Sequence, residues 1–487
     1  MELHQISDTC WEVPRSGQMR VPGRVFTSAG LLDLLRREAA GKGGALQGGA
    51  LQQVVNVAHL PGIVGASMAM PDIHWGYGFP IGGVAAFDWE EGVISPGGVG
   101  YDINCGVRLA STRLVAAEVQ PQLKALADAL YRAIPAGVGT GGEVTLSSKE
   151  ERKVLVAGSR WAVEQGFGHA EDLERTEDGG CMPGADPDTV SERALKRGAN
   201  QLGTLGSGNH FLELGVVERI YAETEARAFG LFEGQLTVLL HTGSRGFGYQ
   251  VCDDFLAKMT KAMRTASLKL PDRQLACAPI RSSAGQRYLG AMACAANYAW
   301  ANRQVLMHLA EETLQRTLGM GPRDLGLRLV YDLCHNIAKK ETHMVEGREQ
   351  TLCVHRKGAT RAFSPGHPVL GSLYRRVGQP IIIPGDMGTA SYVLVGTETA
   401  MQETFGSTCH GAGRVLSRKA AKKQSRGRHI HEELANQGVQ VRWTGRTTLA
   451  EEMPEAYKDI DAVVNVVDTA GLSRKVARLK PLVVVKG

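Results

Sequence analysis

The sequence predicts one large domain of mixed helices and strands, with a functional site assembled where strands end. Short apolar runs typical of strands alternate with long helical segments, and three of these runs deliver a metal-binding type of residue into a polar turn or helix start. The chain of 487 residues has no internal repeat and no linker long enough to divide it. Since the candidate site residues come from residues 102–410, we expect a single domain over residues 1–487.

The composition is that of an ordinary globular protein except for its glycine content. Hydrophobic residues make up 43% and charged residues 22% of the chain, which supplies enough apolar material for a large core. The 60 glycines are about 12% of the 487 residues, against a usual share of roughly 7%, and they cluster beside polar residues. They predict tight turns and close backbone approaches to ligands. The net charge of +5 permits a nucleic-acid partner without requiring one.

Membrane and disulfide-rich classes are disfavoured. No apolar stretch approaches the roughly 20 residues of a membrane span, and the first residues lack a secretory pattern. The nine cysteines include no C-x-x-C pair, which argues against a zinc ribbon and against a disulfide framework. We therefore expect a cytoplasmic protein with no membrane partner.

The N-terminal segments predict packing elements followed by the first candidate loop. Helices are expected near residues 31–39 and 50–58. From Pro71 the chain reads PDIHWGYGFPIGG, which is too irregular for a helix or a long strand, so Asp72 and His74 should lie in a loop attached to a strand. Taken alone, His74 is more readily a hydrogen-bonded structural histidine than a functional one.

A carboxylate and a thiol then occur three residues apart in the segment GYDINCGVR. Asp102 and Cys105 lie in a glycine-rich turn before an expected strand at residues 107–112. At this spacing both side chains can face one metal ion, and a thiolate can bridge two. A buried, inert cysteine beside a turn-forming aspartate is the alternative.

The middle of the chain predicts helices near residues 120–134 and 147–165 and an exposed acidic loop at residues 171–187. Long helices are also expected at residues 249–266 and 290–318. None of these segments carries an obvious chemical motif, so we interpret them as packing elements.

The segment GTLGSGNHFLEL has the composition of a phosphate-binding loop. Arg197 precedes it, and Asn209, His210 and Glu213 begin the strand that follows. Glycines free backbone amides to bind phosphate, asparagine supplies an amide donor, and histidine supplies a metal-binding nitrogen. The glycine spacing of dinucleotide-binding folds and the P-loop are both absent, so a nucleotide would be held in another way.

Two later strands end near histidines. Apolar runs at residues 236–240 and 327–331 lead to His241 and His335. Together with Asp102, Cys105 and His210, these histidines make a plausible metal-binding set, whose donor chemistry would allow zinc or iron and does not fix the metal. The H-x-H formed by His429 and His431 is rejected as a metal site because it lacks a third partner at useful spacing.

Strands are also expected at residues 352–355, in the run PIIIPGDMGTASYVLVG, at residues 463–467 and in the C-terminal PLVVVKG. The turn at Pro384 and Gly385 could expose backbone amides to an anion.

His410 is the strongest candidate for chemistry. It lies between Cys409 and Gly411 in the run FGSTCHGAGRVLSR, where small neighbours would let another molecule approach its ring. A basic run without acids follows at residues 414–428 and should form a helix with Arg414 and Arg418 on one face. Such a run suits phosphates, although a solvated helix is the common alternative.

In their order along the chain, these segments resemble the RtcB family of RNA ligases. The motifs are PDIHWGYGFPIGG, GYDINCGVR, GTLGSGNHFLE, HTGSRGFG, LPDRQLACAPI, CHN, PGDMGT and STCHGAGR, and the match runs from Pro71 to Gly487. Members of the family join an RNA 3′-phosphate or 2′,3′-cyclic phosphate to a 5′-hydroxyl. The resemblance implies the family's α+β fold.

The resemblance also implies roles for individual residues. His410 would attack the α-phosphorus of GTP and become a covalent guanylate. Two manganese ions would be held by Asp102, Cys105, His210, His241 and His335, with the thiolate bridging. The identity of the metal comes from the resemblance alone.

The implied GTP contacts fall into three groups. Phosphate contacts would come from Asn209, His335 and Asn336, and the guanine pocket from Glu213, Ser391, Tyr457 and Lys486. The nucleotide would also lie against the turns formed by Pro384, Gly385, Asp386 and Met387 and by Gly411, Ala412 and Gly413.

The implied RNA phosphate contacts are His74, Arg197, Arg414 and Arg418. Asp386 departs from the family, which commonly has a small hydroxyl residue there. Its carboxylate would either repel the nucleotide phosphates or turn away and cap the following backbone.

The leading hypothesis from the sequence is therefore a GTP- and manganese-dependent RNA ligase of tRNA splicing or RNA repair, with an archease-type activator as a candidate partner. A metal-dependent phosphodiesterase that opens cyclic phosphates without ligation is a second hypothesis. A catalytically idle protein that binds RNA through its basic helix is a third.

Overall fold

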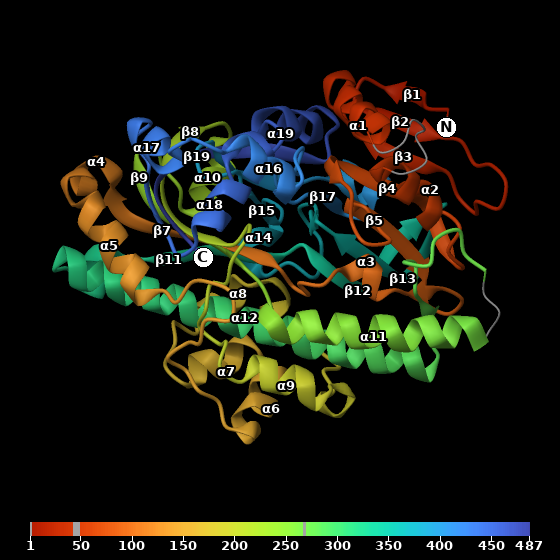
Figure 1. Cartoon of the computed structure of the whole chain (residues 1–487), viewed down its shortest axis with the longest axis horizontal. Helices are drawn as coiled ribbons and strands as arrows, with labels where there is room; N and C mark the ends of the chain where they lie inside the picture. Colours follow the sequence, from red (N-terminus) through yellow and green to blue (C-terminus); the bar gives the residue numbers. More distant parts are fainter. Residues whose placement is uncertain (1, 42–48, 266–268) are drawn as a thin grey trace.

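Two large β-sheets and one long buried helix organise the computed structural model, which describes residues 2–41, 49–265 and 269–487 (Figure 1). Helices and strands are mixed along the chain, and most neighbouring strands are antiparallel. This arrangement confirms the predicted α+β class. Within the described residues, none of the helices has both the length and the apolar character needed to span a membrane.

The first sheet has seven strands, most of them N-terminal. In spatial order they are β1 (His4–Ser7), β2 (Cys10–Val13), β3 (Gly23–Phe26), β4 (Ile63–His74), β5 (Ile81–Asp88), β13 (Arg348–Lys357) and β12 (Asn336–Val345).

The second sheet has eight strands, seven of them on its main path. In spatial order they are β11 (Arg328–Cys334), β7 (Gly106–Val115), β9 (Gln235–Thr242), β8 (Phe211–Ile220), β19 (Ser473–Lys486), β16 (Ser391–Gly396) and β15 (Pro380–Ile383), with β18 (Gln440–Trp443) pairing with β19 off that path. Two short pairs complete the strands, β6 (Val93–Ile94) with β10 (Ala278–Pro279) and β14 (Ala359–Arg361) with β17 (Ser407–Cys409).

Helices surround both sheets (Figure 1). In chain order they are α1 (Ala29–Gly41), α2 (Ala50–Val57), α3 (Pro96–Val99), α4 (Ala116–Val119), α5 (Leu123–Ala133), α6 (Ser148–Ala157), α7 (Ser159–Glu164), α8 (Glu171–Glu174), α9 (Glu192–Gly198), α10 (Glu223–Phe229), α11 (Arg245–Thr265), α12 (Ser283–Leu318), α13 (Pro322–Leu325), α14 (Ser372–Arg375), α15 (Glu398–Thr404), α16 (Arg418–Gln424), α17 (Ile430–Asn436), α18 (Arg446–Glu451) and α19 (Ile460–Thr469).

Helix α12 is the longest element and runs beneath the sheets beside α11 (Figure 1). The Ser282 hydroxyl accepts a hydrogen bond from Gly285 N at its start, and Gly319 ends it in a left-handed conformation. Its side chains are buried over most of its length, including Trp300 and Arg303. The helix therefore serves as a rigid support below the strand ends.

The pairing of the strands brings four of the expected ligands together at the ends of neighbouring strands in the second sheet. Within this sheet β11, β7, β9 and β8 are consecutive neighbours, and His241 of β9 is paired with both Val107 and Phe211. Cys105 immediately precedes β7 and His210 immediately precedes β8, while His335 immediately follows β11. Adjacent ends in one sheet place these side chains within reach of one another.

Several sequence expectations about elements are wrong. The helix expected at residues 147–165 is broken at Gly158, whose φ of +57° and contact with Gly180 O exclude a side chain. The run at residues 463–467 belongs to α19, because its valines bury one helical face behind an Asp459 cap.

Two segments that the sequence predicts to be loops are also different in the structure. Asp72 and His74 end the long strand β4, whose register shifts disguise it in the sequence. The acidic segment at residues 171–187 holds α8 and the buried Glu177, which forms an ion pair with Lys339.

Candidate active site

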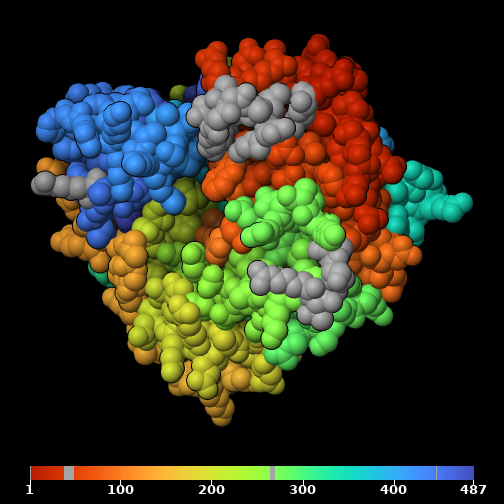
Figure 2. All heavy atoms as spheres, turned by 45° about the vertical axis from the view of Figure 1, so that its right-hand side comes forward, coloured from red at the N-terminus to blue at the C-terminus, as the bar shows by residue number. Residues whose placement is uncertain are grey.

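A cavity of about 840 Å³ gathers most of the residues that the sequence singled out. Figure 2 shows the surface hollowed where the C-terminal segments, in blue, face the yellow and green middle of the chain. The predicted residues on its wall are His74, Asp102, Cys105, Asn209, His241, His335, Asn336, Pro384, Gly385, Asp386, Met387, His410, Gly411, Ala412, Gly413, Arg414, Arg418, Tyr457 and Lys486. His210, Glu213 and Ser391 are buried and are absent from the residues that line it.

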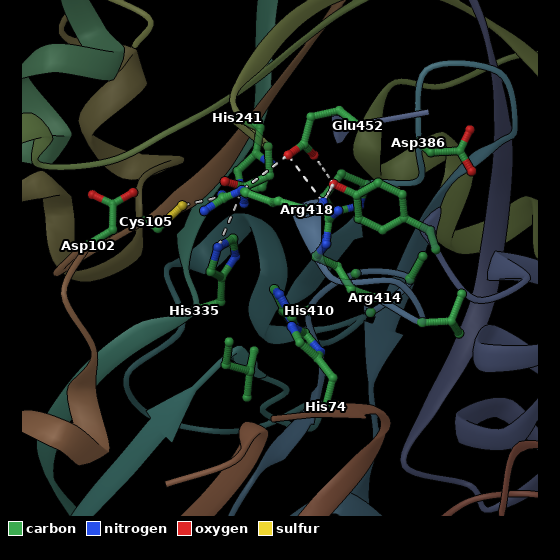
Figure 3. A pocket seen from close by; sticks show the side chains of 18 of the residues that line it. His74, Asp102, Cys105, His241, His335, Asp386, His410, Arg414, Arg418 and Glu452 are labelled. Carbon is green, nitrogen blue, oxygen red and sulfur yellow. Dashed lines mark hydrogen bonds and ion pairs between the residues drawn. The ribbon is translucent and has the colours of Figure 1, made fainter. Parts of the chain in front are cut away.

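The five expected metal ligands form two groups that share one thiol. Cys105, His241 and His335 make one group, and Asp102, Cys105 and His210 make the other. Cys105 Sγ lies 3.4 Å from His210 Nε2. It also lies 3.3 Å from His241 Nε2, and the Nε2 atoms of His241 and His335 are 3.3 Å apart (Figure 3). A thiolate at the junction of two ligand groups can bridge two cations.

A buried network supports this cluster from behind. Asn104, between the two motif ligands, adopts a left-handed φ of +52°, which asparagine tolerates. Arg303 of α12 donates to Asn104 O at 2.8 Å and to Thr242 O at 2.9 Å, and it forms an ion pair with the buried Asp332. These contacts tie the Asp102–Cys105 turn to the end of β9 through one guanidinium group.

Burial decides the protonation of the clustered side chains. It lowers the pKa of His241 and of His335 well below the usual range, so both rings are neutral, the form that binds metal ions. Burial, and then the charge of Asp102, raises the pKa of the Cys105 thiol, whereas a bound cation would favour the thiolate. Asp102 Oδ1 and His335 Nδ1 are buried without a hydrogen-bond partner among the described residues. The donor set therefore fits divalent cations.

His410 is held by Asp72, which lies in β4 of the first, seven-stranded sheet. Asp72 Oδ2 accepts hydrogen bonds from His410 Nδ1 at 2.5 Å, His410 N at 3.0 Å and Gly411 N at 3.3 Å. Burial would raise the pKa of Asp72, but the charge and hydrogen bonds of His410 outweigh burial and lower it. The carboxylate is thus ionised and accepts the Nδ1 proton. The His410 ring centre lies 4.8 Å from that of His335.

The glycines after His410 allow this close approach. Gly413 has a φ of +75°, and a Cβ atom there would lie 2.2 Å from Asp72 O. Only glycine can therefore occupy this position without moving the backbone of β4. The sequence predicts small neighbours around the His410 ring. In the structure these small residues are required because the backbone of β4 packs against the turn after β17.

His74 presents an acceptor to the cavity. Its Nδ1 lies 2.9 Å from Asp72 O, and because a carbonyl oxygen can only accept, Nδ1 carries the proton. Burial lowers the pKa of His74 to about 3, so the ring is neutral and Nε2 has a lone pair. A neutral ring brings no positive charge to a phosphate, and the RNA contact of His74 that the resemblance implies stays a prediction.

Asp386 turns its carboxylate into its own turn, away from the labelled histidines (Figure 3). Oδ1 accepts from Gly388 N at 2.8 Å and Thr389 N at 3.0 Å, and Oδ2 accepts from Thr389 Oγ1 at 2.8 Å. Of the two readings from the sequence, the geometry supports the backbone cap.

Glu213 lies buried next to this turn, and both of its carboxylate oxygens lack a hydrogen-bond partner among the described residues. Burial, and then the charge of Asp386, raises the pKa of Glu213 to about 8. Ser391, the other buried member of the expected guanine pocket, accepts from Gly385 N at 3.1 Å. An unsatisfied buried carboxyl group is costly and points to a ligand with hydrogen-bond donors.

The basic residues are arranged differently from the expected single helix. Helix α16 begins at Arg418, so Arg414 lies in the preceding loop, where Nη1 donates to Glu452 Oε1 at 3.1 Å and Nη2 to Glu451 O at 2.7 Å. Arg418 also faces Glu452 (Figure 3). The expectation of one helical face is therefore wrong, although both arginines line the cavity.

Arg197 lies on α9 and does not line the cavity wall. It donates to Gln250 Oε1 at 3.0 Å, and its guanidinium lies over the Tyr249 ring, 5.3 Å from the centroid. Tyr249 in turn stacks on Tyr101, which does line the cavity. Arg197 thus lies two aromatic rings away from the cavity wall.

Sequence reasoning missed three residues of the cavity region. The sequence motifs give Asp72 no role, and they single out neither Glu452 nor Lys357, both of which line the cavity. Lys357 ends β13 and donates to Tyr77 O at 2.6 Å and Phe79 O at 3.0 Å, while burial lowers its pKa to about 7. The available signal for Lys357 was a lysine two residues beyond the short strand expected at residues 352–355, but Glu452 follows a short helix with no such signal.

Comparison with known proteins shows similarity to one family over most of the chain. A family profile described as tRNA-splicing ligase RtcB matches residues 53–487. The chain is 54% identical over 487 residues to the tRNA-splicing ligase RtcB of Archaeoglobus fulgidus and 52% identical over 486 residues to that of Thermococcus kodakarensis, in each case covering 100% of this chain and 99% of the relative. It is also 55% identical over 438 residues to the RNA-splicing ligase RtcB of Mycobacterium bovis, which covers 89% of this chain and 100% of the relative.

Proposed function

Because the chain belongs to the RtcB family of RNA-splicing ligases, we propose that it ligates RNA with GTP and two manganese ions. The reaction joins 3′-phosphate or 2′,3′-cyclic phosphate ends to 5′-hydroxyl ends, in tRNA splicing or RNA repair. The observation that carries the proposal is the position of His410, which is oriented by Asp72 and adjoins the shared Cys–His cluster.

His410 is the nucleophile in this proposal. When the ring is neutral, the Asp72 carboxylate accepts the Nδ1 proton and Nε2 has the lone pair that attacks the α-phosphorus of GTP. A nitrogen–phosphorus bond forms, the bond from that phosphorus to the bridging oxygen breaks, and pyrophosphate leaves with the electron pair. The ionised Asp72 stabilises the positive charge that develops on the ring.

Asp102, Cys105, His210, His241 and His335 would hold the two cations. When bound, the cations would neutralise phosphate charge and favour the attack on phosphorus. The protein's own part is to keep the histidines neutral by burial and to hold the Cys105 turn through Arg303.

Glu213 supports the choice of guanine. Its buried carboxyl group has no hydrogen-bond partner among the described residues, and the N1 and N2 donors of guanine would favour its ionised form, which can accept both. Adenine has no matching pair of donors, so the same carboxylate would stay unsatisfied with ATP. Tyr457 and Lys486, on the cavity wall, would complete this pocket.

Labelling with radioactive GTP and manganese, followed by denaturing electrophoresis, tests the proposal. The wild-type protein should retain a label that is stable to base and lost in acid, as a phosphoramidate is, and His410→Ala should retain none. An unlabelled wild-type protein that still opens 2′,3′-cyclic phosphates would favour the phosphodiesterase hypothesis. An unlabelled protein that only binds RNA would favour the third hypothesis from the sequence.

A further inference from the structure

We propose that Arg418 and Lys422 form a binding site for a backbone phosphate of the RNA, and that the carboxylate of Glu451 occupies this site until RNA displaces it. The inference rests on the proposed RNA ligase function and adds to it both a phosphate contact, Lys422, and an internal competitor for that contact.

Both cations pair with the Glu451 carboxylate, and Arg418 Nε lies in addition 3.7 Å from Glu452 Oε1. Arg418 and Lys422 are four residues apart on α16, so they lie on one face, and that face packs against α18. Glu451 ends α18 and reaches both, with Oε1 at 2.5 Å from Lys422 Nζ and Oε2 at 3.5 Å from Arg418 Nε. Of these two carboxylates, only that of Glu451 lies between the guanidinium and the ammonium group, as a phosphate would.

This position is continuous with the catalytic cavity. Arg418 lines the same cavity as His410 and Arg414. Beyond Arg418 the exposed basic residues of α16 and its C-terminal loop extend over the surface, and they are Lys419, Lys422, Lys423 and Arg426. An RNA strand whose end lies at His410 would therefore pass Arg418 and Lys422 on leaving the cavity.

The neighbouring Glu452 provides a contrast. Its side chain is fully buried, it pairs with Arg414 at 3.1 Å, and it is hydrogen-bonded by the Tyr457 hydroxyl. Removing a partner from a buried pair leaves an unsatisfied charge, so this contact should persist when RNA binds. Glu452 is a positioning residue for Arg414 and Tyr457.

The Glu451 contacts are of the exchangeable kind. The side chains of Arg418 and Lys422 are 58% and 43% exposed, and that of Glu451 is 18% exposed. Exposed ion pairs contribute only about 0–1 kcal/mol, and they are screened by salt. A phosphate can therefore replace the carboxylate at little cost, but the protein must give up the pair before it gains the phosphate contact.

The test measures binding of a labelled single-stranded RNA with a 5′-hydroxyl end, without GTP. Glu451→Gln should bind this RNA about 2- to 5-fold more tightly than wild type at low salt, which corresponds to losing one exposed competing pair. The advantage should shrink as salt rises. Glu455→Gln is the matched control, because Glu455 pairs with Arg428 at 2.7 Å, has a side chain 45% exposed, and its loss changes the net charge equally.

A second pair of variants locates the phosphate. Lys422→Gln should weaken RNA binding and reduce the slope of log affinity against log salt by about 0.7, the value for one lost contact with a single strand. Lys423→Gln, an exposed lysine on another side of the same helix, should do neither. In the Lys422→Gln background, Glu451→Gln should gain less than it gains in wild type.

The proposal is overturned if Glu451→Gln binds RNA no better than wild type, or if Glu455→Gln gains as much. Equal losses for Lys422→Gln and Lys423→Gln would also overturn it, because binding would then follow total charge. The binding assay requires no nucleotide, so this outcome is separate from the labelling of His410: a protein that labels normally but fails here keeps its proposed function and loses only this site.

Discussion

At the scale of single residues, one carboxylate oxygen organises the catalytic turn. Asp72 Oδ2 accepts from the ring and the backbone of His410 and from Gly411 N. It thereby selects the tautomer in which Nε2 can act as a nucleophile. The same oxygen fixes the backbone of the turn, so chemical activation and positioning depend on one group.

Asp72→Asn should lower the single-turnover rate of guanylylation on the order of 100-fold, because a neutral amide cannot stabilise the positive charge on His410. The rate is measured by quenched labelling at saturating GTP, and circular dichroism checks that the fold is kept. Asp88→Asn is a control, since Asp88 also accepts backbone amides, those of Glu90 and Glu91, in a turn that does not line the cavity. Equal rates for Asp72→Asn and wild type would contradict the assigned role.

Glu213 should make the stability of the nucleotide-free protein depend on pH. Its pKa is about 8 in the folded state against about 4.3 when unfolded, so its burial costs progressively more stability as pH rises between these values. Glu213→Gln should therefore gain melting temperature over wild type at pH 8 and gain less at pH 5. A difference in melting temperature that is the same at both pH values would show that Glu213 does not titrate in this range.

At the scale of elements, the site depends on how the turn after β17 meets β4. Gly413 lies at this contact in a left-handed conformation. Gly427, in the loop after α16, has a similar φ of +79° but no atom within 4 Å of its missing side chain. A side chain at either glycine would strain the backbone, but only one at Gly413 would also collide with a neighbouring strand. Comparing substitutions at the two positions therefore isolates the effect of the collision.

Gly413→Ala should lower the free energy of unfolding by about 1–3 kcal/mol more than Gly427→Ala, because only the first substitution also forces β4 away. It should also abolish guanylylation, whereas Gly427→Ala should keep it. Chemical denaturation and GTP labelling of both variants check this expectation. Equal stability losses would mean that the β4 contact adjusts freely.

At the scale of the whole molecule, the metal cluster connects distant parts of the chain. Its ligands come from residues 102–335 and are supported by α12 through Arg303. A ligand that binds only the folded state stabilises the fold as a whole. Metal binding should thus be visible in global unfolding, without any activity measurement.

Manganese at about 100 times its dissociation constant should stabilise the wild-type protein by about 2.7 kcal/mol per site. Cys105→Ser should lose most of this effect, because a neutral hydroxyl replaces the thiol shared by both ligand groups. The measurements are thermal unfolding with and without manganese and the metal content of the purified protein. A full manganese shift in Cys105→Ser would mean that Cys105 is not a ligand.

Local sequence signals were sufficient for much of this protein. The sequence predicted the mixture of helices and strands, and it placed ligand-type residues at the ends of apolar strands. Cys105, His210, His241 and His335 could be named because each lies at or next to a strand end, and Asp102 because it lies three residues before Cys105 in the same turn. Within the described residues, these predicted ligands do lie together.

Tertiary structure alone decided the contacts that act across the chain. Asp72 and His410 are 338 positions apart, and nothing in either motif states that one orients the other. Glu452 belongs to no recognisable motif. Arg414 lies in the loop before α16, outside the expected helix, and pairs with Glu452. The sequence does not decide which way the Asp386 carboxylate points; the hydrogen bonds from Gly388 N and Thr389 N within its turn do. Hydrogen bonds and ion pairs between distant segments depend on how two backbones meet, and periodicity and motif spacing report only the conformation of each segment by itself.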